Sequence, residues 1–178
     1  MIAAIFDTET TGLVENRALP LSKLPEVIEF YGATVDLDAD VVIEELDVLI
    51  RPSRMPLPRK IVEITGITDA DLDGKPSFGE VLAGITGLFS KADVVISHNA
   101  SFDSEMLEIE AQRLGVELKL PRLLCSVEQT VTLTGQRLSL SALHENLFGM
   151  KFPSAHRARN DARALIRCCV ELKRREVL

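Results

Sequence analysis

Acidic side chains next to a short apolar run are the first residues in this chain that could do chemistry. Asp7 and Glu9 follow the apolar residues 2–6, where neighbouring Thr and Gly residues indicate a turn. Residues two apart in an extended strand point to the same face, so we expect both carboxylates to project together from the strand end. Such a pair either keeps a proton or is held ionised by a cation, and oxygen ligands suit Mg²⁺ or Mn²⁺. A solvated pair at a surface turn is the alternative interpretation.

Two further aspartates stand in the first turns of predicted helices. Asp103 follows the apolar strand at residues 92–97, and Asp161 opens the last helix. A first-turn acid also stabilises a helix through the helix dipole, by about 0.3–1 kcal/mol, so each aspartate alone has a purely structural explanation. Both, however, lie at ends of elements that flank apolar strands, where an α/β sheet gathers its ligand crevice. This placement predicts that they converge with Asp7.

His156 precedes Asp161 by five positions, an offset that would make the two side chains face apart on a continuous helix. We therefore expect His156 to lie on the loop that follows residues 153–155 and to lean over the site from there. A free imidazole has a pKa near ~6.5, which suits it to take a proton from water near neutral pH. A surface histidine without a chemical role is the alternative interpretation.

The elements that must position these residues form an α/β pattern with a mixed sheet. Five strands are expected, at residues 2–6, 27–35, 41–50, 92–97 and 122–125, the second and third joined in an antiparallel hairpin across residues 36–40. Helices are expected after residue 58 and at residues 77–89, 101–114, 126–133, 139–148 and 160–178, with Ser101 as the N-cap of the third. Residues 1–178 are interpreted as one domain.

Composition places the chain among globular proteins. It has 178 residues, 46% hydrophobic and 26% charged, which excludes disordered and low-complexity classes. No apolar run approaches the ~18 residues of a membrane span, and the first apolar run lacks a signal peptide's basic start. The three cysteines, Cys125, Cys168 and Cys169, are odd in number and predict free thiols in a reducing compartment. We therefore expect a soluble, cytoplasmic protein without a membrane partner.

Charge is segregated along the chain. The net charge of −7 argues against a nucleic-acid partner, yet residues 151–178 carry 8 basic and 3 acidic side chains, against 12 and 24 in residues 1–150. A second basic segment, residues 51–60, contains no acid. It either touches phosphate or is a solvated loop. Its basic residues are Arg51, Arg54, Arg59 and Lys60.

Three strings resemble, in order, the three motifs of the DEDDh 3′→5′ exonucleases. They are FDTETTGL at residues 6–13, HNASFD at 98–103 and HRARNDA at 156–162. Two smaller matches, EVIEF at 26–30 with Gly32 and ITGIT at 64–68, resemble the proofreading (epsilon-type) branch of bacterial replicative polymerase subunits. The resemblance extends from residue 2 to about residue 168, so it covers nearly the whole chain.

The resemblance implies a ribonuclease H-like fold and a metal-dependent enzyme. It implies two divalent cations, Mg²⁺ with Mn²⁺ as a substitute, and hydrolysis at the 3′ end of single-stranded DNA to nucleoside 5′-monophosphates. An exoribonuclease that trims RNA ends and a non-catalytic nucleic-acid-binding module are the alternatives. The related tyrosine-dependent group is disfavoured, because the sole tyrosine, Tyr31, lies in a strand expected far from the third motif. The implied metal ligands are Asp7, Glu9, Asp103 and Asp161, with His156 as general base.

The resemblance also implies a substrate site. For three of the residues implied there is an alternative to substrate contact. Leu13 and Phe102 would be core residues, and Asn99 would only brace the loop of Asp103 by hydrogen bonds. With no Trp and seven Phe, extended base stacking is not expected, so a short single-stranded 3′ end is favoured. The implied contacts to the terminal nucleotide come from Thr10, Thr11, Gly12 and Leu13, flanked by His98, Asn99 and Phe102.

Two departures from the family pattern bear on access and partners. The connection at residues 14–25 is long and contains two prolines, which predicts an ordered lip beside the site. The epsilon-type subunit binds its polymerase through a C-terminal extension, whereas here 17 residues follow Asp161. A polymerase partner through that route is therefore doubtful, and a free-standing enzyme is the alternative. For Asp103→Ala we expect loss of activity with little loss of folding.

Overall fold

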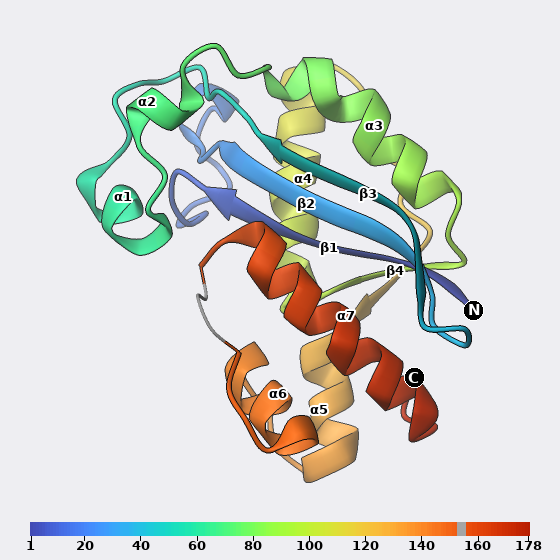
Figure 1. Ribbon diagram of the computed structural model, residues 1–178. Helices are drawn as coiled ribbons and strands as arrows, with labels where there is room; N and C mark the ends of the chain where they lie inside the picture. Colours follow the sequence, from blue (N-terminus) through green and yellow to red (C-terminus); the bar gives the residue numbers. More distant parts are fainter. Residues whose placement is uncertain (153–155) are drawn as a thin grey trace.

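The protein is built on a five-stranded mixed sheet in the computed structural model, which describes residues 1–152 and 156–178 (Figure 1). The strand order is β3-β2-β1-β4-β5; β1 pairs antiparallel with β2 and parallel with β4. The strands are β1 (Ile2–Thr10), β2 (Val27–Asp36), β3 (Val41–Leu49), β4 (Val94–Ser97) and β5 (Arg122–Cys125). The hairpin and the mixed sheet expected from the sequence are confirmed.

Helices cover both faces of this sheet, each over its own hydrophobic core (Figure 1). On one face α7 packs against β1, β2 and α6. On the other face α3 packs on β2 and β3, while α4 contacts β4 and β5. The helices are α1 (Arg59–Thr65), α2 (Asp69–Leu72), α3 (Phe78–Ser90), α4 (Ala100–Arg113), α5 (Ser126–Thr134), α6 (Leu140–Phe148) and α7 (Ala158–Arg174), with a 3-10 turn η1 (Leu21–Lys23).

Strand β1 is longer than predicted, and its length shapes the site. The expected turn after Phe6 is wrong, because pairing with β2 continues through Glu9 and Thr10. Pairing with β4, in contrast, covers only Ala3 to Ile5. From Phe6 onward, β1 therefore has no β4 neighbour on that edge, and a crevice opens between the carboxyl ends of the two parallel strands.

Helix α4 also starts differently from the prediction. Its N-cap is Asn99, with φ 68° and ψ 48°, and the helix begins at Ala100, so Ser101 is a first-turn residue and not the cap. Asn is one of the few residues other than Gly that adopts this left-handed conformation readily. The tight reversal brings Asp103 back toward the end of β4, from which the chain has just come.

Tyr31 lies closer to the third motif than expected. It sits in β2 opposite Asp7, in the core cluster that α7 covers, with the Arg163 guanidinium 6.0 Å from its ring centre. Its hydroxyl donates to Glu45 Oε2 at 2.7 Å. Tyr31 therefore packs near the start of α7, although it was expected far from the third motif. Its hydroxyl is bonded to Glu45 on β3 and not to the carboxylates of the site.

The three thiols are unpaired with one another, and three arginines of the basic segment form ion pairs. All three thiols are free; Cys168 and Cys169 are buried, and burial raises the pKa of Cys168 to about 12. In residues 51–60, Arg51, Arg54 and Arg59 each form an ion pair with an acid of the chain. None of the helices in the described residues is long and apolar enough to span a bilayer.

Candidate active site

Three carboxylates meet where α7 begins over the end of β1. Asp7 and Glu9 lie on the same face of β1, as their spacing predicted, and Asp161 reaches them from the first turn of α7. One oxygen from each lies within 4.8 Å of the others. Carboxylate oxygens this close match the ligand preference of a hard divalent cation. Their placement therefore fits the metal site that the sequence predicted.

Asp103 approaches from the other face of the sheet. Its Oδ1 accepts hydrogen bonds from the Thr8 backbone N–H at 3.1 Å and the Thr8 hydroxyl at 2.7 Å, and Oδ2 accepts from Ser97 Oγ at 2.6 Å. The side chain is buried, and it lies outside the group of three carboxylates. Asp103 thus closes the crevice between β1 and β4, and it still repels the charge on Asp7.

These bonds argue against the expectation that Asp103→Ala causes little loss of folding. Alanine leaves the Thr8 and Ser97 donors without their acceptor, and a buried unsatisfied group costs about 1–3 kcal/mol. Asparagine removes the charge and keeps an acceptor for Thr8. We therefore expect Asp103→Ala to be less stable than Asp103→Asn by about 2 kcal/mol, measured by urea unfolding in EDTA. Equal stability of the two variants would contradict this role.

The segment before α7 is folded back onto Asp161. Asp161 Oδ2 accepts from the backbone N–H of His156 at 2.7 Å and of Arg157 at 3.1 Å. His156 adopts φ 69° and is exposed, outside the helix as expected. The residues of the predicted loop before it, 153–155, lie outside the described residues. The fold therefore brings the predicted base and the predicted ligand Asp161 to one turn.

The electrostatics of the cluster disfavour its fully ionised form. Burial first, and then the charges of Asp103 and Asp161, raise the pKa of Asp7 well above its usual value. Burial and the neighbouring carboxylates raise the pKa of Glu9 to about 8. Burial also raises the pKa of Asp161, and it raises the pKa of Asp103 to about 6. A bound divalent cation would offset this repulsion, since opposite charge favours the ionised form.

These raised pKa values predict a pH-dependent stability. A carboxyl whose pKa is higher in the folded protein than in the unfolded chain favours folding when protonated. That contribution is lost as the pH rises from the unfolded pKa near ~4 through the folded pKa, which is about 6 for Asp103 and about 8 for Glu9.

In EDTA we therefore expect the melting temperature to fall by about 5 °C between pH 5 and pH 8. Mg²⁺ should raise it more at pH 8 than at pH 5. Differential scanning fluorimetry measures both, with Asp73→Asn, which changes an exposed carboxyl, as the control. A Mg²⁺ effect that is the same at both pH values would contradict the interpretation.

The predicted nucleotide contacts at residues 10–13 form a fixed ridge. Thr10 Oγ1 donates to the Gly12 carbonyl at 2.7 Å. Thr11 is bonded twice to Glu26, through its backbone N–H at 2.8 Å and its hydroxyl at 2.9 Å. Leu13 at the tip is 73% exposed, which excludes the core alternative for this residue. An apolar side chain held out in water beside the carboxylates is suited to contact a base.

The predicted flanking residues behave differently from one another. Phe102 is half-buried and lines the groove beside the ridge while also packing on the core. His98 Nδ1 lies 2.8 Å from Ser126 Oγ, and burial lowers its pKa to about 4, so its ring is neutral at physiological pH. Asn99 shapes the turn into α4. Of these three residues, Phe102 is the one that lines the groove.

The groove itself has a wall that the sequence analysis did not assign to the site. The groove has a volume of about 390 Å³ and runs between the ridge and α1. The exposed apolar side chain of Ile64 faces it, and Lys60 supplies a positive charge. The signal for this wall was the smaller ITGIT match, which begins at Ile64. The residues from α1 and its start are Pro58, Lys60, Ile61, Ile64 and Thr65.

The long connection at residues 14–25 is fastened to α4, as the lip predicted from its prolines requires. Arg113 Nη2 donates to three carbonyl oxygens of this segment, at 3.0 Å for Leu21 and 2.8 Å for both Leu24 and Pro25. Arg17 donates to Gln112 at 2.7 Å. The lip therefore stands as a fixed border beside the ridge.

Comparisons with known proteins identify the family of this chain. Residues 4–169 match the family model RNase_T, whose description is Exonuclease. The epsilon subunit of DNA polymerase III from Treponema pallidum is 32% identical over 173 residues, covering 94% of this chain and 72% of that protein. The PolC-type DNA polymerase III of Thermotoga maritima is 34% identical over 160 residues, 89% of this chain but 11% of that protein.

The fold has a close solved counterpart. The nuclease domain of 3′hExo, a DEDDh family member bound to rAMP, superposes with a TM-score of 0.81 over 98% of this chain and 92% of that one. Sequence identity there is 19%, so this likeness supports the ribonuclease H-like architecture alone. The family match and the epsilon relative confirm the resemblance carried by the three motifs: this chain belongs to the exonuclease family.

Proposed function

We propose that this protein is a metal-dependent 3′→5′ exonuclease whose single domain spans residues 1–178. The observation that carries the proposal is the meeting of Asp7, Glu9 and Asp161 within 4.8 Å, beside a groove that can hold a strand end. Asp103 completes the acidic set from the opposite face of the sheet. A binding module that had lost catalysis would have no need to keep these repelling carboxylates buried together.

The residues present fit two divalent cations, Mg²⁺ or Mn²⁺. Asp7, Glu9, Asp103 and Asp161 would hold them, and four carboxylates would balance their four positive charges. When bound, such ions supply charge stabilisation on both the attacking and the leaving oxygen of a phosphodiester. Among the described residues, Asp103 Oδ2 accepts a single hydrogen bond, from Ser97, so this oxygen keeps a lone pair for an ion.

His156 would act as the general base. It takes a proton from water, the water oxygen bonds to phosphorus, and the bond to the 3′ oxygen of the preceding nucleotide breaks, with that oxygen taking a proton from the solvent. The products are a nucleoside 5′-monophosphate and a chain shortened by one residue with a free 3′ hydroxyl. The ridge at residues 10–13 and Phe102 would orient the terminal nucleotide, and His98 and Asn99 would flank it, as the resemblance to the family implies.

Single-stranded DNA is the favoured substrate, because both sequence relatives described above are DNA polymerase III proteins. An RNA end is the second candidate, and the specific observation behind it is the 3′hExo domain bound to rAMP. By the same relationship a polymerase is the candidate partner, and a free-standing enzyme is the alternative. A cytoplasmic location, expected from the cysteine usage, is part of this proposal.

The test is a gel time course on a 5′-labelled 20-nucleotide DNA and the matched RNA, with Mg²⁺, Mn²⁺ or EDTA. A ladder that shortens from the 3′ end, and that EDTA abolishes, is the expected result. A 3′-phosphorylated DNA of the same sequence serves as the control, because it removes the free 3′ hydroxyl. Cleavage at internal positions, or no cleavage with either metal, would contradict the proposal.

A further inference from the structure

A further carboxylate, beyond the four already assigned to the site, lies next to Glu9. Glu29 is in β2, directly opposite Glu9 in the register, and it is 1% exposed. The adjacent positions are apolar and equally buried, so this strand places a charge where water cannot reach it. A buried carboxylate without a partner is strongly unfavourable, so its contacts indicate why it is there.

Glu29 is bonded wholly to the start of α7. Its Oε1 accepts from Arg157 Nη2 at 2.7 Å and Nε at 3.1 Å, and its Oε2 accepts from Nε at 3.1 Å. The same Oε2 accepts from the Ala158 backbone N–H at 2.9 Å. The pairing of guanidinium and carboxylate is two-pronged, and the last bond satisfies one of the free N–H groups of the helix end.

Glu29 and Asp161 both bind the turn at residues 156–158, Glu29 from the sheet and Asp161 from the helix that follows the turn. Asp161 takes the backbone N–H groups of His156 and Arg157, and Glu29 takes the Arg157 side chain and the next N–H. The turn therefore has two carboxylate anchors, one belonging to the helix and one to the sheet. The sheet anchor is the only one of the two that fixes the turn relative to Asp7 and Glu9.

We propose that Glu29 is a positioning residue that, through Arg157 and Ala158, fixes His156 and Asp161 over Asp7 and Glu9. The inference rests on the proposed nuclease function. Both Glu29 oxygens are occupied, so it is not offered as a metal ligand. Arg157 also places a positive charge beside Glu9, which partly offsets the repulsion in the cluster.

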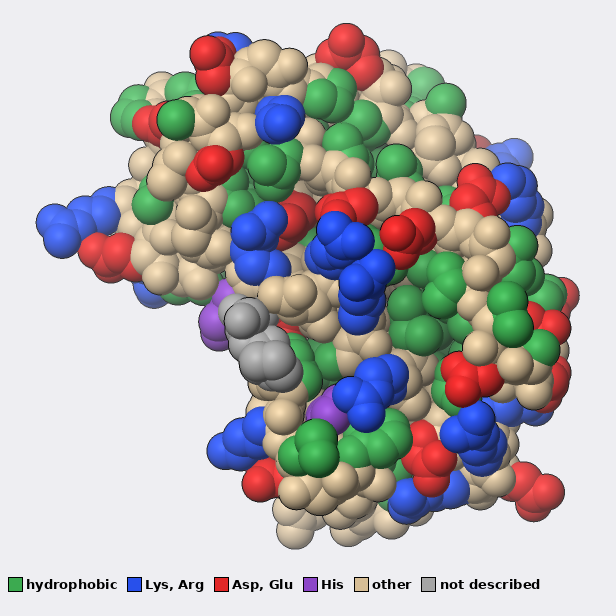
Figure 2. Space-filling view, in the orientation of Figure 1, with side chains coloured by type: hydrophobic (Ala, Val, Ile, Leu, Met, Phe, Trp, Pro, Cys, Tyr) green, Lys and Arg blue, Asp and Glu red, His purple; other side chains and the backbone are tan. Residues whose placement is uncertain are grey.

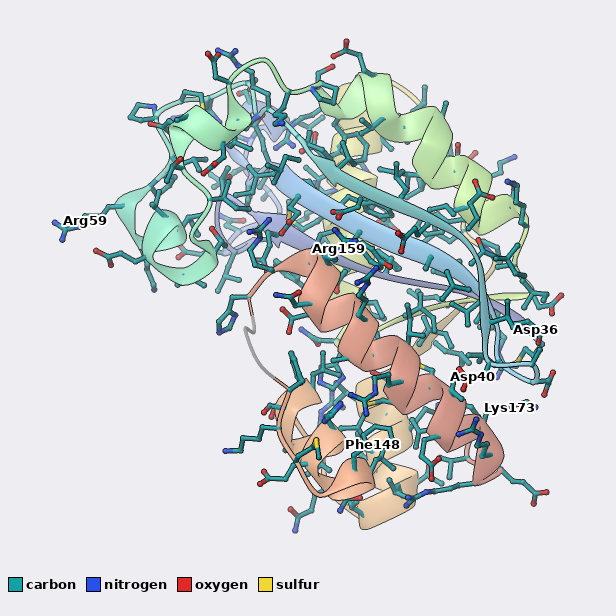
Figure 3. The ribbon with its side chains drawn as sticks, in the orientation of Figure 1. Asp36, Asp40, Arg59, Phe148, Arg159 and Lys173 are labelled. Carbon is teal, nitrogen blue, oxygen red and sulfur yellow. The ribbon has the colours of Figure 1, made fainter. Side chains whose placement is uncertain are left out.

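A second ion pair between α7 and the sheet provides a matched control. Arg159 Nη1 lies 3.0 Å from Asp47 Oδ2 on β3, and both side chains are part-exposed, at 45% and 32%. Figure 3 labels Arg159 at the N-terminal end of α7, and Figure 2 shows basic and acidic side chains together over this part of the molecule. Asp47→Asn, like Glu29→Gln, removes a carboxylate of the sheet that pairs with an arginine of α7, and it leaves in place the hydrogen bonds that hold His156, Arg157 and Ala158.

The experiment compares Glu29→Gln with Asp47→Asn in the full chain. We measure kcat and KM on the labelled oligonucleotide, and Mn²⁺ affinity by titration of the melting temperature. For Glu29→Gln we expect kcat to fall about 10–100-fold and Mn²⁺ affinity to fall by a similar factor, with KM changed less than threefold, as for lost outer contacts of metal sites. Asp47→Asn should match the wild type. Arg157→Lys keeps the charge and loses the two-pronged geometry, so its kcat and Mn²⁺ affinity should lie between those of Glu29→Gln and Asp47→Asn. This variant replaces Glu29→Gln in the comparison if Glu29→Gln does not fold.

The outcomes separate this inference from the proposed function. If the wild type degrades the oligonucleotide and Glu29→Gln equals Asp47→Asn in kcat and Mn²⁺ affinity, the positioning role is wrong and the nuclease assignment stands. A loss of stability with unchanged kcat would also overturn it, because it would make Glu29 merely structural. If the wild type degrades nothing, the function fails, and the Mn²⁺ affinities alone decide whether Glu29 arranges the carboxylates.

Discussion

Replacing Asp7 by asparagine should abolish hydrolysis while making the metal-free protein more stable. Asp7 stands at the centre of the cluster, where it feels the charges of Asp103, Asp161 and Glu9. Metal-ion stabilisation is worth several kcal/mol and each 1.4 kcal/mol is tenfold in rate, so we expect turnover to fall by about 10³-fold or more. Initial rates with Mg²⁺ on single-stranded DNA measure the loss.

The stability half of this prediction has a definite sign. The folded pKa of Asp7 is raised, so its charge disfavours folding increasingly as the pH rises above its unfolded value near ~4. Asp7→Asn should therefore melt higher than the wild type in EDTA at pH 8, and the two should converge toward pH 5. Asp73→Asn, which changes an exposed carboxyl, is the control. Full activity in Asp7→Asn, or a lower melting temperature at pH 8, would contradict the account.

Replacing His156 by alanine should separate chemistry from metal binding. General-base catalysis contributes typically about 10²–10⁴-fold, so we expect kcat to fall by that factor. His156 binds Asp161 through its backbone N–H, which alanine keeps, so the carboxylate geometry should survive. Mn²⁺ affinity, read from the melting temperature, should stay within twofold of the wild type.

A matched change tests whether the effect belongs to the imidazole. Lys151→Ala removes an exposed charged side chain a few residues before His156 and should leave turnover unchanged. Added imidazole should restore part of the rate of His156→Ala and none of the rate of Asp7→Asn. Loss of Mn²⁺ affinity in His156→Ala would reassign this histidine as a ligand.

The elements of the fold were predictable from periodicity, and the boundaries that matter for the site were not. Short runs of apolar and β-branched residues predict all five strands, yet the polar residues after Phe6 hide the continuation of β1. That continuation depends on pairing with β2, a partner some twenty residues away, which local pattern cannot reveal. The Asn99 cap could not be predicted for the same reason. Its left-handed backbone conformation depends on the reversal of the chain between β4 and α4, which local pattern does not reveal.

The charged residues of the candidate site could be predicted from spacing and motifs. Most of the residues that hydrogen-bond to them could not. Spacing placed Asp7 and Glu9 on one face, and the motifs named Asp103, Asp161 and His156. Thr8 and Ser97, which bind Asp103, carry no sequence signal of that role. Glu29 does carry one, since an acid within an otherwise apolar strand needs a partner, and the Arg next to His156 is that partner.

The measurement that tests the central claim most directly is product analysis in ¹⁸O-labelled water. The wild type is incubated with an unlabelled DNA oligonucleotide and Mg²⁺, and the products are identified by mass spectrometry, with Asp7→Asn as the blank. Water attack at the terminal phosphodiester predicts nucleoside 5′-monophosphates with one ¹⁸O on the phosphate, released one at a time. Nucleoside 3′-phosphates, longer fragments, or the same products from Asp7→Asn would contradict it.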